Sequence, residues 1–345
     1  MEIPIFEKKN VLVTGGAGFI GSHLCERLLK EANVICVDNF TNSHPNNIKH
    51  LLQYADFEFI NADVTLPIDL DRFDELDKFK VKFQGIQEIY HLACSANPEN
   101  FEKMKMDALR ANSLSMISTL DLAVKYRSKY VFSSSSVVYG EDISKRNFFK
   151  ETDQGIVQHL SSRACYDEGK RFAETCVETY RQVHGIDAKM ARVFTTYGPH
   201  MQLLEKRMIP DFIYNALQGK DLVIYGDESF STSLCYVTDM VDGMVRLMAA
   251  EPEISVVNFG GDREVRYKEV AETIVAMTNS ASRVVFEKPM LFTTRKGIPD
   301  ISRAKEALGW LPLVRLEDGL RKTIDYVIAH REALMLNNFG SPSLR

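Results

Sequence analysis

A tyrosine and a lysine, Tyr166 and Lys170, stand four residues apart in a stretch that the sequence predicts to be helical. Positions i and i+4 lie on one face of a helix, so the lysine ammonium is one turn from the phenol. A free phenol has a pKa of about 10, which is too high for a base at neutral pH. We expect the charge of Lys170 to lower the pKa of Tyr166 and make the phenolate a general base for a hydroxyl proton.

A run of four serines supplies a third polar group for the same chemistry. Ser135 lies in this run, at the end of a predicted strand, and its hydroxyl can bond to the substrate hydroxyl that Tyr166 deprotonates. A tyrosine and a lysine at this spacing are common, and most such pairs lie on solvated helix faces. Their position after a dinucleotide motif and after the serine run favours the catalytic interpretation.

That motif is a glycine-rich stretch between a predicted strand and a predicted helix, with glycines at positions 15, 18 and 21. Gly15 permits a tight turn, Gly18 lets the backbone approach a pyrophosphate, and Gly21 lets the helix pack closely on the strand. Phe19 and Ile20 lie in the same stretch, just before a predicted helix whose N-terminus faces the phosphates. A glycine turn without a ligand is the alternative, and the strand–helix context disfavours it.

Two acidic residues follow the next predicted strands. Asp38, followed by Asn39, can accept hydrogen bonds from the ribose hydroxyls of adenosine, and its charge repels a 2′-phosphate. This position predicts NAD rather than NADP as the cofactor, although a simple turn aspartate is the plainer interpretation. Asp63, followed by Val64, could contact the adenine, and an Asx-turn explains Asp63 nearly as well.

Composition limits the class of protein. The 345 residues are 45% hydrophobic, and 42 Lys and Arg against 47 Asp and Glu leave a net charge of −5. Such a chain lacks the cationic surplus of a nucleic-acid-binding protein. The six cysteines form no C-x-x-C pair, no metal cluster is recognisable, and no apolar run could span a membrane. We therefore expect a cytoplasmic protein without a signal peptide, a metal or a membrane contact.

The predicted elements alternate between strands and helices through the first half of the chain. This rhythm predicts βαβ units and a Rossmann-type, doubly wound parallel sheet of the α/β class. The predicted strands are residues 10–13, 34–37, 57–60, 86–92, 129–132 and 187–194, and the predicted helices are 21–31, 104–125 and 166–184. The charged run 71–82 is interpreted as a solvated helix face.

A second, smaller α/β lobe is predicted after Pro199. Its predicted helices are residues 207–218, 238–250, 267–278 and 316–331, and its predicted strands are 221–225, 256–259 and 284–286. We divide the chain into an NAD-binding domain, 1–198, a substrate lobe, 199–331, and a loose tail, 332–345. The lobe can exchange elements with the first domain.

Taken together, these motifs resemble the extended short-chain dehydrogenase/reductase family, which contains NAD-dependent epimerases, dehydratases and decarboxylases of nucleotide sugars. The resemblance runs from Val11 to about Ile328 and looks closest to the UDP-glucuronate decarboxylases. It rests on Asn47-Ile48-Lys49-His50-Leu51, Asp63-Val64-Thr65, His91-Leu92-Ala93-Cys94, Cys165-Tyr166-Asp167-Glu168-Gly169-Lys170-Arg171, Thr196-Tyr197-Gly198-Pro199 and Pro299-Asp300-Ile301.

The resemblance implies the rest of the site and a reaction. Tyr166 would take the proton of the sugar C4 hydroxyl while NAD⁺ takes the hydride, and the resulting keto acid would lose CO₂ and be reduced again. A homodimer through the helices at 104–125 and 166–184 is also implied. Further cofactor residues are Leu92, Ala93, Asn112 and Ser133; substrate residues are Ser95, Ser136, Thr195, Arg207, Tyr225 and Arg295.

Four positions depart from the decarboxylase pattern. Val137 replaces a Glu, Thr195 an Asn, and Thr232 and Gly297 each replace an Arg. Each lost charge-assisted contact costs about 1.5–3 kcal/mol unless a nearby cation such as Arg207 compensates. The oxidation machinery is therefore complete in sequence, while the substrate end is altered.

Several activities remain open at this point. A nucleotide-sugar 4-epimerase acting on a UDP-hexose or UDP-glucuronate uses the same oxidation, and Val137 favours it slightly because epimerisation needs no further acid. A 4,6-dehydratase is disfavoured, since neither Ser136 nor Val137 is acidic. A net oxidoreductase on an unusual sugar nucleotide and a non-catalytic NAD-binding scaffold are further alternatives.

Overall fold

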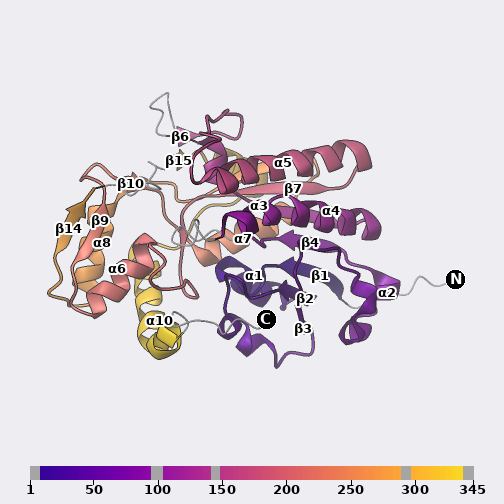
Figure 1. The fold of residues 1–345 in the computed structure, drawn as a ribbon, viewed down its shortest axis with the longest axis horizontal. Coiled ribbons are helices and arrows are strands. Elements are labelled where there is room, and N and C mark those ends of the chain that lie inside the picture. Colours follow the sequence, from indigo (N-terminus) through magenta and orange to yellow (C-terminus); the bar gives the residue numbers. More distant parts are fainter. Residues whose placement is uncertain (1–7, 95–103, 141–147, 289–296, 337–345) are drawn as a thin grey trace.

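The computed structural model describes residues 8–94, 104–140, 148–288 and 297–336 (Figure 1). Its centre is a seven-stranded sheet in the order β12-β7-β5-β4-β1-β2-β3, and every pairing in it is parallel. The strands are β1 (Lys9–Thr14), β2 (Ala32–Asp38), β3 (Phe57–Asn61), β4 (Glu88–His91), β5 (Lys129–Ser135), β7 (Ala188–Val193) and β12 (Val256–Phe259). The predicted doubly wound parallel sheet is confirmed, and its order reverses between β1 and β4, where such sheets bind ligands.

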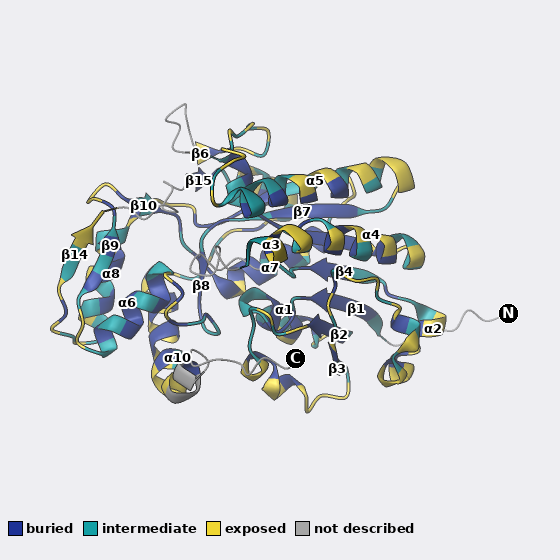
Figure 2. Ribbon diagram, viewed as in Figure 1, coloured by how far each residue is buried: buried dark blue, intermediate teal, exposed yellow. Residues whose placement is uncertain are grey.

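Helices cover both faces of this sheet (Figure 1). Helices α1 (Phe19–Leu28) and α7 (Val237–Ala249) pack on one face, and α3 (Lys105–Ala111), α4 (Leu114–Tyr126) and α5 (Ala164–His184) lie on the other. The central strands are buried almost throughout (Figure 2), which is why they are apolar runs rather than alternating ones.

The predicted helix at 104–125 is wrong, because the chain forms two helices with a break at Asn112 and Ser113. The Asn112 amide donates to Ala108 O at 2.8 Å, within the predicted helix, and to Cys94 Sγ at 3.3 Å, outside it. The charged run 71–82 also differs, since it forms short 3₁₀ turns, Leu70–Arg72 and Asp74–Phe79, before α2 (Val81–Gln84).

A smaller lobe carries its own core beside the large sheet (Figure 1). Strands β9 (Leu222–Tyr225) and β14 (Val284–Glu287) form a parallel pair, packed with α6 (Met208–Leu217), α8 (Tyr267–Met277) and α10 (Leu316–Leu336). Helix α10 continues past the expected end at residue 331. The chain beyond Pro199 also returns to the first domain, because β12 pairs with β7 and α7 packs on the central sheet.

Two-residue strands form three further pairs, and the sequence pattern does not reveal them because they are too short to show a period. They pair as β6 (Phe148–Phe149) with β15 (Ile298–Pro299), β8 (Thr196–Tyr197) with β11 (Cys235–Tyr236), and β10 (Ser231–Thr232) with β13 (Val265–Arg266). The short helix α9 (Ser302–Leu308) was also missed. Among the described residues, no helix is long and apolar enough to cross a membrane.

Candidate active site

The glycine-rich turn between β1 and α1 is packed so closely that there is no space for a side chain at Gly15 or Gly21. Gly15 has a φ of +71°, and a Cβ there would lie 2.7 Å from Ala93 N. A Cβ on Gly21 would lie 2.1 Å from Gly15 O, so helix and turn touch at this point. Gly18 caps α1 and faces a cavity. The cradle therefore fits a dinucleotide pyrophosphate at the helix N-terminus.

Phe19 and Ile20 follow as the first residues of α1. Their side chains pack against the core of the smaller lobe rather than the cavity. Only their backbone N–H groups at the helix N-terminus are thus placed to meet a phosphate.

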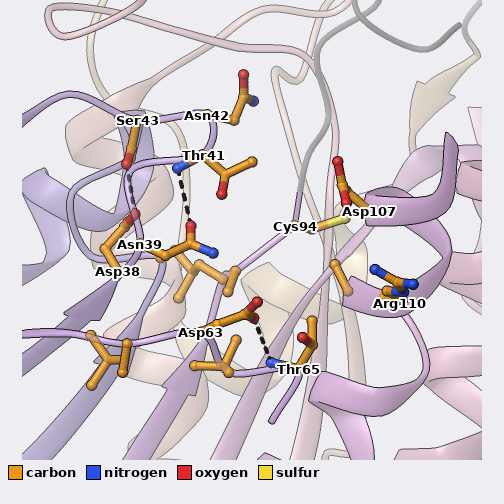
Figure 3. Close-up of a pocket in the computed structure, with 18 residues that line it drawn as sticks. Asp38, Asn39, Thr41, Asn42, Ser43, Asp63, Thr65, Cys94, Asp107 and Arg110 are labelled. Carbon is orange, nitrogen blue, oxygen red and sulfur yellow. Dashed lines mark hydrogen bonds between the residues drawn. The ribbon is translucent and has the colours of Figure 1, made fainter. Parts of the chain in front are cut away.

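A cavity of about 170 Å³ opens at the carboxyl ends of β1 to β4 (Figure 3). Most of the predicted cofactor residues line it, and α3 closes its far side. The lining includes Gly15, Gly18, Asp38, Asn39, Asp63, Val64, Leu92, Ala93, Cys94, Asp107 and Arg110. The sequence predictions from four separate strand ends thus meet in one cavity, with the dimensions of part of a dinucleotide site.

Asp38 is held rigidly at the wall of this cavity (Figure 3). Its carboxylate accepts hydrogen bonds from Ala17 N at 3.0 Å, Phe40 N at 2.9 Å and Ser43 Oγ at 2.6 Å. A carboxylate has about four lone-pair sites, so one remains for a ribose hydroxyl. The turn role and the ribose role are therefore compatible in this aspartate.

Asp63 also combines its two interpretations. Its Oδ1 accepts from Thr65 N at 2.9 Å, which is the Asx-turn, and the same residue lines the cavity (Figure 3). The turn fixes the carboxylate where an adenosine could meet it.

Tyr166 and Lys170 lie on α5 and face the end of β5. A hydrogen bond joins Tyr166 to Ser135, the last residue of β5. The Lys170 ammonium, only 3% exposed, donates to Ser133 O at 2.9 Å and lies 4.6 Å above the centre of the Phe132 ring. The three predicted catalytic groups therefore meet at one place, and Ser133 takes part through its carbonyl.

The electrostatics of this group correct one prediction. Burial raises the pKa of Tyr166 well above its usual value, and the bond to Ser135 and the charges of Arg163 and Arg207 oppose that shift only in part. The expected lowering by Lys170 is thus wrong for the protein alone, because desolvation dominates. Burial lowers the pKa of Lys170 itself, against the influence of Cys94 and Glu174.

The residues predicted for the substrate are spread over both lobes. Thr195 Oγ1 and Thr232 Oγ1 lie 3.1 Å apart, so two of the departing positions contact each other, and Thr232 is 1% exposed. Arg207 caps α6, and its Nε lies 3.1 Å from a carboxylate oxygen of Glu205. Its charge reaches Tyr166, as the preceding pKa shift indicates.

The contacts described above involve none of the other predicted substrate positions. Ser136 opens the turn Ser136–Tyr139 next to Ser135, and Tyr225 ends β9 in the smaller lobe. Ser95 and Arg295 lie outside the described residues. Gly297 packs against Phe149, whose ring would lie 1.8 Å from a Cβ, so no larger side chain fits unless this ring moves.

His91 has a structural role. Its two ring nitrogens lie 2.7 Å from Thr14 Oγ1 and 3.2 Å from Ser115 Oγ, and burial lowers its pKa to about 3. It is therefore a neutral, bonded core group. No group of three or more possible metal-ligating side chains is present in the described part of the chain.

Sequence reasoning missed several residues at this site. Asp107 and Arg110 line the cavity from α3, and their spacing of three could have suggested one shared helix face. Ser43 holds Asp38 from five residues away, which no motif signals. Glu174, one turn beyond Lys170, forms a partly buried ion pair with Arg192, and only the fold brings them together.

Comparison with known proteins adds family and relatives to this geometry. Residues 11–260 match the model of the NAD dependent epimerase/dehydratase family. The chain is 36% identical to UDP-glucuronic acid decarboxylase 1 of Danio rerio over 322 residues, which are 93% of this chain and 73% of that protein. It is 36% identical to UDP-glucuronic acid decarboxylase 5 of Arabidopsis thaliana over 312 residues, 90% of this chain and 86% of that protein.

Solved structures share the fold over almost the whole length. UDP-glucuronic acid 4-epimerase from Bacillus cereus, in complex with UDP-glucuronic acid and NAD, superposes with a TM-score of 0.80 at 27% identity, covering 93% of this chain and 99% of that one. An epimerase from Methanothermobacter thermautotrophicus gives a TM-score of 0.82 at 28% identity, covering 96% and 95%.

Proposed function

The chain belongs to the NAD dependent epimerase/dehydratase family, and from that premise we propose that it oxidises C4 of the sugar of UDP-glucuronate transiently and releases CO₂. NAD is the cofactor, and the activity is that of an NAD-dependent nucleotide-sugar enzyme. The two curated relatives named above are decarboxylases, which favours loss of CO₂ as the outcome.

One observation carries this proposal: Ser135, Tyr166 and Lys170 meet beside the cavity that the glycine turn and Asp38 border. In this arrangement the cofactor lies in the portion 1–198 and the sugar nucleotide faces the portion 199–331. Arg207 supports it, because a guanidinium whose charge reaches Tyr166 suits a substrate with a diphosphate or a carboxylate.

The residues divide the work as follows. Bound at the glycine turn and Asp38, NAD⁺ supplies the acceptor for the C4 hydride. Tyr166 Oη accepts the proton of the C4 hydroxyl, and Ser135 fixes that hydroxyl within reach. Lys170 favours the phenolate through its charge, held in place by Ser133 O. The ketone at C4 then stands β to the carboxylate, and CO₂ leaves because the carbanion becomes an enolate. A proton added at C5 and the hydride returned to C4 would then complete the product and restore NAD⁺.

A second candidate function is 4-epimerisation of the same nucleotide sugar. Val137, in the turn Ser136–Tyr139 beside Ser135, offers no acid for steps after the oxidation. The structural likeness to a UDP-glucuronic acid 4-epimerase supports this candidate. Both candidates share the oxidation and differ only in what happens to the ketone.

The test is to incubate the purified protein with UDP-glucuronate and NAD⁺ and to follow the product by mass spectrometry and NMR. Loss of the mass of CO₂ supports decarboxylation, and unchanged mass with altered ring couplings supports epimerisation. UDP-, GDP-, CDP- and dTDP-hexoses serve as comparison substrates. If none of these compounds turns over while NAD binds, the protein is a scaffold and the proposal fails.

We also propose a homodimer through α3, α4 and α5. Helices α4 and α5 lie side by side (Figure 2). The exposed apolar side chains on these three helices are Met106, Leu109, Leu114, Ile117 and Phe172. A dimer would bury this patch. A cytoplasmic location is supported by the six cysteines, all of which are free thiols.

A further inference from the structure

Three consecutive serines of β5 contact successive turns of α5. Ser133 O accepts from Lys170 Nζ at 2.9 Å, and Ser135 bonds to Tyr166. Between them, Ser134 Oγ donates to Glu174 Oε1 at 2.6 Å. Glu174 lies one turn beyond Lys170 on the same face of the helix. The middle contact therefore involves neither a proposed catalytic group nor the cofactor cavity.

Glu174 is held from a second strand as well. Arg192 on β7 donates from Nε to Glu174 Oε1 at 2.9 Å and from Nη2 to Oε2 at 2.8 Å. Both side chains are 13% exposed, and Arg192 is the register partner of Ser134 in the sheet. Such a two-pronged pair fixes distance and angle together, because the fork is planar. The carboxylate thus locks α5 onto two neighbouring strands.

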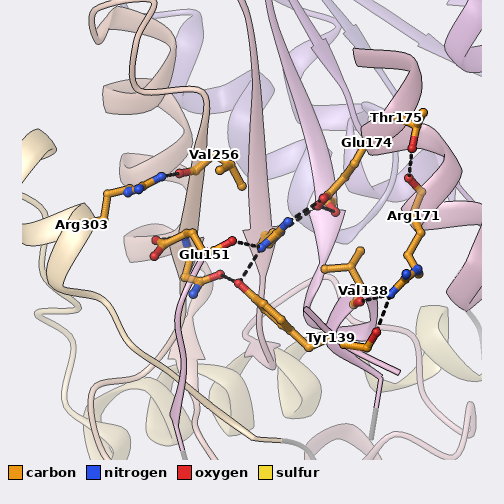
Figure 4. Close-up of polar contacts among 12 residues, drawn as sticks. Val138, Tyr139, Glu151, Arg171, Glu174, Thr175, Val256 and Arg303 are labelled. Carbon is orange, nitrogen blue, oxygen red and sulfur yellow. Dashed lines mark hydrogen bonds and ion pairs between the residues drawn. The ribbon is translucent and has the colours of Figure 1, made fainter. Parts of the chain in front are cut away.

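The same arginine also bonds to Tyr139 and Glu151 (Figure 4). Its Nη1 donates to the Tyr139 hydroxyl and to Glu151 O, both at 2.9 Å. The Tyr139 hydroxyl donates to Asn258 Oδ1 at 2.6 Å, and its ring stacks on Phe149 with centres 4.7 Å apart. The network therefore connects α5 with β12 and with the segment that packs against Gly297.

We propose that Glu174 and Arg192 are positioning residues that hold α5 in register with β5, so that Tyr166 and Lys170 meet Ser135 beside the cavity. This inference rests on the proposed function, because the groups being positioned are its catalytic groups. A misplacement of about 1 Å in a reacting group lowers rates by about 100-fold. A partly buried bidentate pair one turn beyond Lys170 resists that displacement.

The sharpest test removes one contact and leaves the ion pair. Ser134→Ala frees one carboxylate oxygen from β5, and Ser128→Ala is its matched control. Ser128 is buried just before the same strand, and its hydroxyl donates to Ile86 O at 2.7 Å, away from the site. In the holoenzyme with UDP-glucuronate, we expect Ser134→Ala to lower kcat about 10-fold with KM and NAD affinity unchanged. Ser128→Ala keeps kcat. Equal kcat values for the two variants overturn the inference.

Glu174→Gln tests the charge of the same group. Lys170 is faced by Cys94 from the end of β4, by His91 on β4, and by Tyr166 and Glu174 on α5. The charge of Glu174 raises the pKa of Lys170, so its removal lowers that pKa. The alkaline limb of the pH–rate profile therefore moves to lower pH. Glu174→Asp restores the charge and brings that limb back. A limb that stays in place in Glu174→Gln overturns the positioning role.

A readout without turnover separates this inference from the proposed function. NADH is added to each protein, and the emission of the bound nucleotide reports the surroundings of the nicotinamide. We expect Ser134→Ala to change the emission at unchanged NADH affinity, and Ser128→Ala to match the wild type. Emission that is the same in all three proteins overturns the inference. If the wild type turns over no nucleotide sugar, the proposed function fails, and this comparison still decides the positioning role.

Discussion

The cofactor half and the sugar half of this molecule are built in different ways. The cofactor half takes a glycine turn, Asp38 and two strand ends from the first third of the chain, and each has its local motif. The sugar half is assembled from distant positions: Thr195 meets Thr232, and Gly297 meets Phe149. The first half carries the motifs expected of the family, whereas the second has small side chains, in contact with each other or with a ring, where we expected larger polar residues.

We infer from this difference that oxidation by NAD⁺ and the choice of sugar are separable properties of the fold. The proposed oxidation depends on α5 and β5, where Tyr166 bonds to Ser135 and Lys170 bonds to Ser133 O. The substrate end can therefore diverge while NAD binding and oxidation remain. The following predictions test this separation, beginning with the largest effect.

Tyr166→Phe should lower turnover by roughly 10²–10⁴-fold while NAD binding is unchanged, because it removes only the general base. Turnover is measured with UDP-glucuronate, and NAD content by absorbance of the denatured protein. Tyr130→Phe is the matched control, since Tyr130 is a buried tyrosine of β5 whose hydroxyl lies 2.9 Å from Thr119 Oγ1. Unchanged activity in Tyr166→Phe contradicts its role as base.

Gly21→Ala should reduce NAD affinity at least about 10-fold, since the added Cβ would lie 2.1 Å from Gly15 O and push the turn out of shape. Affinity is measured by calorimetry. Gly219→Ala is the control: its φ is +66°, but no atom lies within 4 Å of the added Cβ. If Gly21→Ala binds NAD normally, the cofactor half does not depend on the close packing of turn and helix.

The junction between the halves should be sensitive to acid. His200 stacks on His23 of α1 with ring centres 4.5 Å apart, and it also contacts Tyr326 of α10. Burial, then the neighbouring histidines, lowers the pKa of His200 to about 3, and burial lowers that of His23. Below pH 6.5 the unfolded chain binds protons that the folded one excludes, so stability present above that pH is lost as the pH falls.

For His200 alone this loss is at most about 2 kcal/mol at pH 5. Thermal unfolding at pH 7 and pH 5 measures it, and His200→Asn should reduce the difference between the two melting temperatures. Burial also lowers the pKa of His91 to about 3, and this histidine lies inside the cofactor half. The variant His91→Asn therefore serves as the comparison. If His200→Asn leaves the pH dependence of the wild type, the junction is not the sensitive region.

The sequence predicts the cofactor half better than the sugar half. The glycine turn and Asp38 could be predicted because their reasons are local: a strand, a turn and a helix that meet in sequence order. The break at Asn112 could not, because the side chain bonds to Cys94 on another segment. The pKa of Tyr166 was predicted in the wrong direction, since spacing reveals the neighbouring lysine but not the burial of the phenol.

The contacts of the sugar half could not be predicted either, because they join residues that are far apart in the sequence. Family resemblance marked Gly297 as a departure, but only the fold shows that the ring of Phe149 fills the space beside it. In the same way, the pairing of Glu174 with Arg192 depends on strand register, which the sequence does not reveal.

Thr195→Val should have the smallest effect and restrict it to the sugar half. The substitution removes a hydroxyl that lies 3.1 Å from Thr232 Oγ1 and keeps the shape of the side chain. Thr195 is a proposed substrate residue, and a lost neutral hydrogen bond to the nucleotide sugar costs about 0.5–1.5 kcal/mol, so KM for that substrate should rise about 2- to 12-fold. NAD affinity should not change, because Thr195 does not line the cofactor cavity. A change in NAD affinity instead of KM would show that the two halves are coupled through β7, and the separation drawn above would then be wrong.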